Sequence, residues 1–155
     1  MRGWLSLSLL IEFTKVSTLK NLDLRLELKK QANLILKAYN DLTLSMEVAN
    51  TCRIRSLAAR SRIGSCDEMI WNDKHAKNQK DMVSFERFIK VPDAYRDSLS
   101  QKELETEIIM LHKISIDLNA IQEYYEESQI ENKEHGKELK ADSIRKMEMF
   151  TGHLK

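Results

Sequence analysis

Apolar residues recur every three or four positions through two long stretches of the chain, with polar residues between them. In an α-helix this spacing gathers the apolar side chains into one stripe that packs along a neighbouring helix. The pattern predicts one helix over about residues 18–62 and another over about residues 99–135. The first stripe consists of Leu24, Leu28, Ala32, Ile35, Tyr39, Leu42, Met46, Ala49 and Cys52, and the second of Leu104, Ile108, Leu111, Ile114, Leu118, Ile121 and Tyr125.

Local signals mark where these two helices begin and end. Ser100 followed by Glu103 forms a capping box, the typical start of a helix. Gly64 offers a stop for the first long helix, because glycine readily adopts the left-handed conformation that follows a helix. Gly136 is expected to end the second long helix in the same way.

The remaining segments are predicted to be shorter. Residues 65–81 are polar and lose the helical period, so we expect a polar connector there. A short helix over about residues 82–91 should end before Pro92, because the residue before a proline avoids helical geometry. A terminal helix is expected over about residues 137–151.

Glycine and proline are scarce: the 155 residues include four glycines and one proline. Average usage, about 12%, would give roughly eighteen. The sequence therefore predicts one all-α domain over residues 1–155, a helical bundle dominated by two long antiparallel helices in a coiled-coil-like hairpin. A competing interpretation is an N-terminal β-hairpin, because leucines alternate over residues 5–9 and again over residues 22–28.

The N-terminal segment leaves three interpretations open. Residues 4–16 are largely apolar, apart from a polar stripe of Ser8, Glu12 and Lys15. We expect a mostly buried first helix, with contact to a membrane surface and an export element as the alternatives. No stretch of the chain is apolar enough to suggest a membrane span.

The net charge of +1 hides two halves of opposite sign. Residues 1–92 hold sixteen Lys and Arg against ten Asp and Glu, whereas residues 93–155 hold nine against fourteen. We expect the halves to pair within one bundle. The two cysteines, Cys52 and Cys66, have no CxxC spacing, which indicates reduced thiols and a cytoplasmic location.

The sharpest local feature is a window of four arginines, Arg53, Arg55, Arg60 and Arg62, with no acid between residues 48 and 66. Guanidinium groups suit phosphate binding, which makes a nucleic-acid-binding regulator the alternative function, assisted by lysines of the polar connector. On a helix, however, the four arginines fall on two roughly opposite ridges. The competing interpretation is that they pair with acids of the C-terminal half.

Signals for catalysis or a metal are weak. Glu131 and His135 share a helix face, but no second pair accompanies them. Cys52 lies on the first stripe, where burial would make its thiol inert. No glycine-rich phosphate loop or nucleophile elbow occurs. We therefore expect no catalytic residue, cofactor or metal.

Aromatic residues outside the regular stripes are candidate partner contacts. Trp71 lies among polar residues, and Tyr124 and Tyr125 point in different directions from one helix. Together with the arginine window they are the residues we expect to contact a partner or a phosphate. The function we predict is a non-catalytic protein–protein interaction module of the adaptor, chaperone or scaffold kind, acting through exposed helical faces by self-association into an oligomer or with a helical partner.

Overall fold

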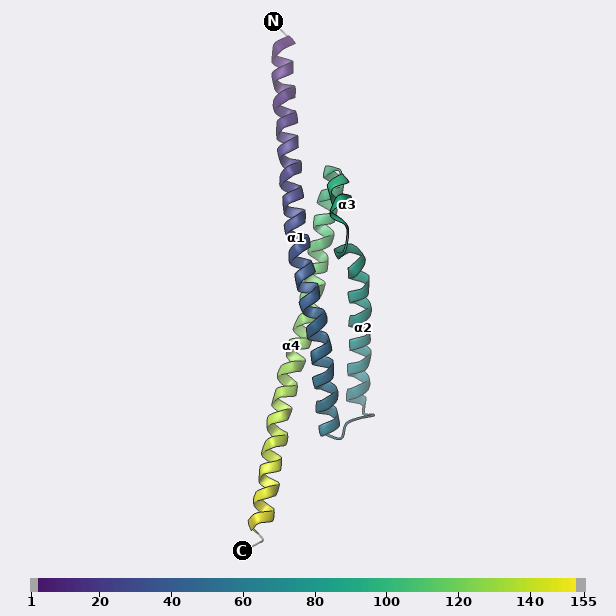
Figure 1. The fold of residues 1–155 in the computed structure, drawn as a ribbon, viewed down its shortest axis with the longest axis vertical. Coiled ribbons are helices and arrows are strands. Elements are labelled where there is room, and N and C mark those ends of the chain that lie inside the picture. The colour runs from purple at the N-terminus through teal and green to yellow at the C-terminus, as the bar shows by residue number, and fades with distance from the viewer. Residues whose placement is uncertain (1–2, 153–155) are drawn as a thin grey trace. The chain divides into compact units, whose positions relative to one another are not determined.

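The computed structural model describes the backbone of residues 3–152 and the side chains of residues 15–151. Over that range the chain forms four helices and no strand: α1 (Gly3–Ala59), α2 (Cys66–Ile89), α3 (Asp93–Ser98) and α4 (Gln101–Gly152) (Figure 1). The predicted all-α bundle with two long helices is confirmed. The β-hairpin is excluded, because residues 22–28 are part of α1.

The helices contribute to two compact units. The first unit combines Met1–Ala38 with Ser84–Ile116, and the second combines Tyr39–Val83 with Asp117–Lys155. Helices α1, α2 and α4 therefore each supply residues to both units, whereas α3 belongs to the first.

The first unit has an apolar core. The predicted stripes are buried here as expected, because apolar side chains at helical spacing leave water when two helices pack. The capping box is also present: the Glu103 carboxylate accepts hydrogen bonds from the backbone N–H and the hydroxyl of Ser100, at 2.7 and 2.6 Å. The core residues are Leu28, Ala32, Ile35, Ile89, Leu99, Leu104, Leu111 and Ile114.

The second unit packs three helices around a core of mixed character. Both predicted stripes continue into it, and α2 adds a third stripe that includes polar residues. The core residues are Tyr39, Leu42, Met46, Ala49 and Leu57 from α1, Trp71, His75, Asn78 and Met82 from α2, and Leu118, Ile121, Tyr125 and Ser128 from α4.

The predicted antiparallel arrangement of the two long helices is wrong in the second unit. Arg53 of α1 contacts Glu131 of α4, and Arg60, further along α1, contacts His135, further along α4. Both helices therefore run in the same direction. The physical reason is α2, which carries the chain back before α4 begins (Figure 1).

Helix α2 replaces the polar connector expected at residues 65–81 and includes most of the short helix expected at 82–91. Its inward positions are Trp71, His75, Asn78 and Met82, spaced by four, three and four residues. Two of these side chains are polar, so a search for apolar periodicity does not detect the helix.

The ends of α1 and α4 also differ from the prediction. Ser61, with φ of 54°, takes the left-handed position that ends α1, and the Arg62 N–H donates to the Leu57 carbonyl at 2.8 Å. Gly64, with φ of 78°, shapes the turn that follows. Gly136 does not end α4, which continues to Gly152 and includes the segment predicted as a separate terminal helix. A glycine inside a helix costs only about 1 kcal/mol.

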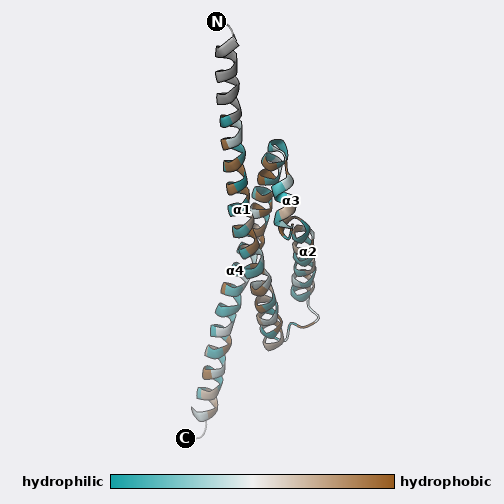
Figure 2. Cartoon of the chain, turned by 45° about the horizontal axis from the view of Figure 1, so that its top comes forward, coloured by the Kyte–Doolittle hydropathy of each residue, from teal (hydrophilic) through white to brown (hydrophobic). Residues whose placement is uncertain are grey.

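The buried first helix, membrane contact or export element predicted over residues 4–16 falls almost wholly outside the described side chains, which begin at residue 15. None of the helices, over the described part of the chain, is long and apolar enough to cross a membrane. At the other end, α4 beyond residue 139 is mostly hydrophilic with scattered hydrophobic residues (Figure 2). Its side chains from residue 140 to 151 are all exposed.

Candidate functional site

The predicted contact residues all belong to the second unit, where Arg53 occupies a core position. The buried stripe of α1 passes from Ala49 to Leu57 through Arg53, whose side chain is only 13% exposed. Its Nη1 donates to Glu131 Oε2 at 2.8 Å and to Asn132 Oδ1 at 3.2 Å. The guanidinium carbon also lies 5.6 Å from the ring centre of Trp71, within cation–π range. Arg53 therefore bridges α1, α2 and α4.

Trp71 is the centre of an aromatic cluster. Its ring is nearly parallel to that of Tyr124, with centroids 5.6 Å apart, and nearly perpendicular to that of Tyr125, at 5.7 Å. The indole N–H donates to Asn50 Oδ1 at 2.7 Å. Trp71 and Tyr125 are 3% and 1% exposed, so both belong to the interior of the unit rather than to its surface. Tyr124 is half-buried.

A histidine and a tyrosine are hydrogen-bonded inside this cluster. His75 Nδ1 lies 2.6 Å from the hydroxyl of Tyr125. Burial lowers the pKa of His75 below its ordinary value of 6.5 and raises the pKa of Tyr125 above its ordinary value of 10.0. Both rings are therefore neutral near neutral pH, which suits a structural hydrogen bond in a buried position.

A small cavity lies beside Trp71. It has a volume of about 380 Å³ and is lined by Arg53, Trp71, Tyr124, Glu127, Ser128 and Glu131. The buried hydroxyl of Ser128 has no hydrogen-bond partner in the structure. A cation lies over each ring of the stacked pair. The Arg53 guanidinium lies over Trp71, and the Lys74 ammonium lies 5.3 Å from the ring centre of Tyr124.

Two further arginines of the window also bind residues of the same unit. Arg60 Nη1 lies 3.0 Å from Nδ1 of His135, and Arg62 Nη1 lies 2.5 Å from Asp67 Oδ2. Glu131, the acid that pairs with Arg53, belongs to the C-terminal half, but it is not among the partners predicted there, which were Glu103, Glu105, Glu107, Glu123, Glu126 and Glu127. Asp67, the partner of Arg62, belongs to the N-terminal half.

Arg55 differs from the other three arginines. It is exposed, and no hydrogen bond or ion pair involves it among the described residues. It lies along an open groove of about 450 Å³ between α1 and α4. The groove is lined by Val48, Cys52, Arg55, Ser56 and Ala59 of α1 and by Gln129, Asn132, Lys133, Gly136 and Leu139 of α4.

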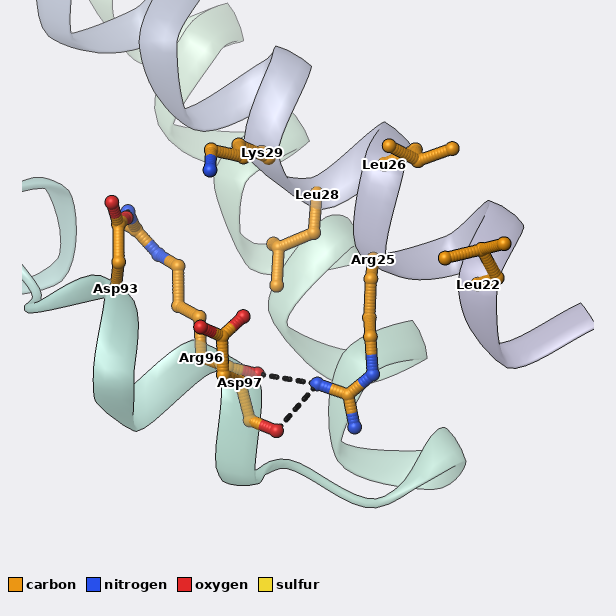
Figure 3. Close-up of a pocket in the computed structure, with 8 residues that line it drawn as sticks. All are labelled: Leu22, Arg25, Leu26, Leu28, Lys29, Asp93, Arg96 and Asp97. Carbon is orange, nitrogen blue, oxygen red and sulfur yellow. Dashed lines mark hydrogen bonds and ion pairs between the residues drawn. The ribbon is translucent and has the colours of Figure 1, made fainter. Parts of the chain in front are cut away.

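The first unit has a pocket of its own, of about 220 Å³, next to α3 (Figure 3). Arg25 points into it and donates hydrogen bonds to the backbone carbonyls of Arg96, Asp97 and Leu99, at 3.1, 2.7 and 2.8 Å. Arg96 and Asp97 belong to the last turn of α3 and Leu99 caps it, and the Arg96 carbonyl also accepts from the Leu99 N–H at 3.4 Å. A cation is favourable at the carbonyls of a helix C-terminus. Arg25 thus joins α1 to α3.

The structure shows no metal-ligand cluster: within the described residues no three His, Cys, Asp or Glu side chains gather. Glu131 and His135 lie 4.0 Å apart, and each also contacts an arginine. The prediction that Cys52 is buried is wrong, because the α1 stripe passes through Arg53 and leaves Cys52 exposed at the groove. Cys66 is also exposed, and neither forms a disulfide.

Sequence reasoning missed the polar residues of this interior. None of the six was expected there: His75, Asn78 and Ser128 are buried, and Asn50, Asn132 and His135 are partly buried. The signal that identifies them is spacing rather than polarity. Beyond Tyr125, the α4 stripe continues through Ser128, Asn132 and His135 to Leu139, at intervals of three and four residues.

Comparison with known proteins finds no matching family model, no matching curated protein and no matching solved structure. The helices themselves define the class of the protein, which is an all-α helical bundle.

Proposed function

We propose that this chain is a non-catalytic protein–protein interaction module that binds a helix of another polypeptide through exposed helical faces. The observation that carries the proposal is a second apolar stripe on α1 in the first unit. Leu19, Leu22 and Leu26 are 61%, 53% and 60% exposed, and their spacing of three and four residues places them on one face. Exposed contiguous apolar faces of this kind are typical of interaction sites.

This stripe is distinct from the core. At 100° per residue, Leu22 and Leu26 lie on the side of α1 away from buried Leu28, and Figure 3 shows the three side chains pointing in different directions. A helix that packs on one side only needs one apolar stripe. Leu22 and Leu26 line the pocket next to α3 but each keeps more than half of its surface exposed, which supports a partner there.

The nucleic-acid alternative has less support. Arg53, Arg60 and Arg62 are each engaged with a side chain of their own unit. The lysines expected on a flexible loop belong to α2, where Lys74 lies over Tyr124 and Lys77 lies 3.8 Å from Asp81. Few cations of the window are therefore free for phosphates. The exposed, unpaired cysteines fit a reducing compartment, so we place the module in the cytoplasm as part of the same proposal.

The test compares the proteins that co-purify with three forms of the full chain after cross-linking in the native host. The double variant Leu22→Glu and Leu26→Glu places two charges on the exposed stripe. The control Lys37→Glu makes the same change of charge at an exposed position further along α1. Light scattering of each purified form measures self-association.

We expect a protein that is retained by the natural chain and by Lys37→Glu and is lost from the double variant. Circular dichroism should be the same for all three forms, because both leucines are exposed. If all three forms retain the same proteins in the same amounts, the proposal is wrong. If light scattering shows that the stripe joins two copies of this chain, the interaction is self-association.

A further inference from the structure

The second unit has an open groove of about 450 Å³ between α1 and α4. All of its lining residues come from these two helices and none from α2. Helix α2 packs against both α1 and α4. The groove is therefore the position in which a fourth helix would contact the same two helices. A groove between two helices accepts an amphipathic helix through an apolar ridge.

The floor of the groove is apolar or small. Val48 is 51% exposed, and Ala59, Gly136 and Leu139 continue the floor toward the end of the unit. A side chain at Gly136 would meet open space, because no heavy atom lies within 4 Å of an added Cβ. Small residues at this point let another backbone approach closely, as ridge-into-groove packing requires.

The charge of the groove has one sign. Arg55 and Lys133 are its only charged lining residues. Neither makes an ion pair or hydrogen bond among the described residues. Two unpaired cations beside an apolar floor favour acidic side chains on the flanks of an occupant.

A second copy of this chain does not meet that requirement with either of two exposed segments. Its exposed apolar stripe on α1 lies in residues 15–30, which contain five basic and two acidic residues. The exposed end of α4, residues 140–151, contains three basic and two acidic residues. Both segments would bring positive charge toward Arg55 and Lys133, which opposes docking.

We infer that this groove binds one amphipathic helix of a partner protein, with an apolar ridge toward Gly136 and acidic residues toward Arg55 and Lys133. The partner helix would complete a four-helix arrangement with α1, α2 and α4. The inference rests on the proposed interaction function and assigns the chemistry of a second, separate surface.

The experiment selects binders for the full chain from a displayed library of helical peptides of about twenty residues. The peptides share a fixed leucine ridge and carry random residues at the flanking positions. The selection is repeated on Gly136→Leu, which fills the groove, on Gly136→Ala, and on Arg55→Glu with Lys133→Glu, which reverses its charge. Lys113→Glu, an exposed change in the first unit, is the control.

We expect the natural chain to enrich peptides with Asp and Glu on the flanks. Those peptides should keep their affinity for Gly136→Ala and Lys113→Glu and lose about tenfold or more on Gly136→Leu, because a filled groove excludes the ridge. The charge-reversed variant should instead enrich basic flanks. Circular dichroism and urea unfolding check that each variant is folded.

Several outcomes overturn the inference. They are enrichment of basic or neutral flanks by the natural chain, no enrichment at all, and unchanged affinity for Gly136→Leu. Binding of short RNA or DNA that Arg55→Glu abolishes and acidic peptides do not displace would show a phosphate site instead. The double variant Leu22→Glu and Leu26→Glu is selected in parallel. If the double variant still enriches acidic-flanked peptides but has lost its host partner, the result supports the groove independently of the first-unit stripe.

Discussion

The two units bury different kinds of residue. Among the side chains described from residue 15 onward, those buried in the first unit are all apolar, whereas the second unit buries His75, Asn78 and Ser128 and holds Arg53 in a core position. Apolar burial stabilises without directional requirements, but buried polar groups need matched partners. The first unit is therefore the kind of core that tolerates conservative apolar exchange. The second is the kind in which the identity of each polar side chain decides how the helices align.

The largest expected effect tests the apolar core of the first unit. Leu111 is fully buried, so Leu111→Ala should lower the free energy of unfolding by about 2–5 kcal/mol, because it removes buried apolar surface and leaves a cavity. Urea unfolding followed by circular dichroism measures the change. The control Ile109→Ala, at an exposed position, should change stability by less than about 0.5 kcal/mol. Equal effects of the two variants would contradict the assignment of the core.

The next comparison matches one arginine from each unit. Arg25→Met removes three hydrogen bonds to backbone carbonyls, one of which (Arg96) also accepts from the Leu99 N–H, and should cost about 1.5–3 kcal/mol. Arg53→Met should cost less than about 1 kcal/mol, since its partner Glu131 is half exposed and methionine fits an apolar stripe. Urea unfolding of both variants measures the difference. A larger loss for Arg53→Met would show that the polar interior contributes more than the link between α1 and α3.

The third comparison concerns the effect of pH on stability. The core of the second unit contains a histidine, His75, whereas the described core of the first unit is apolar. Because burial lowers the pKa of His75 below 6.5, the unfolded chain takes up a proton near pH 6.5 that the folded chain binds only at lower pH. Stability should therefore be full above that pH and fall as the pH drops through it. Urea unfolding at about pH 7.5 and about pH 5.5 tests this. His75→Gln should show a smaller fall, and an equal fall would contradict the role given to His75.

The smallest expected effect is that of Ser128→Ala. The Ser128 hydroxyl is buried without a hydrogen-bond partner, so its removal deletes a desolvated polar group. We expect the free energy of unfolding to change by less than about 1 kcal/mol, in the direction of greater stability. Thermal unfolding measured by circular dichroism is sensitive enough for this shift. A loss of more than about 1 kcal/mol would mean that the hydroxyl has a partner in solution.

The sequence predicted the parts of the fold in which the buried positions of a helix are occupied by apolar residues. The stripe from Leu28 to Ala49 on α1 and the stripe from Leu104 to Tyr125 on α4 are buried almost throughout, and the start of α4 at the Ser100 capping box is correct. These predictions depend on spacing and local hydrogen bonding, which are visible in the sequence of a single helix.

The parts that the sequence could not predict are those in which a polar side chain occupies a core position. Because His75 and Asn78 are polar, the buried stripe of α2 was not recognised and α2 was not predicted. Without α2 between them, α1 and α4 were expected to be antiparallel rather than parallel. For the candidate site, Arg53, Trp71, Tyr124 and Tyr125 were predicted as partner or phosphate contacts, and the structure brings them together inside the second unit, with Trp71 and Tyr125 buried. Their burial depends on long-range packing, which one sequence does not reveal.

The direction of α1 and α4 in the second unit is the claim on which the polar interior and the groove both depend. Oxidative cross-linking of Arg60→Cys with His135→Cys tests it most directly, with Cys52 and Cys66 replaced by serine. We predict rapid disulfide formation in that pair, because Arg60 and His135 are in contact. The pair Arg60→Cys with Asn119→Cys should not cross-link, since residue 119 lies about 24 Å along α4 from residue 135. The reverse result, cross-linking at residue 119 and not at residue 135, would contradict the account.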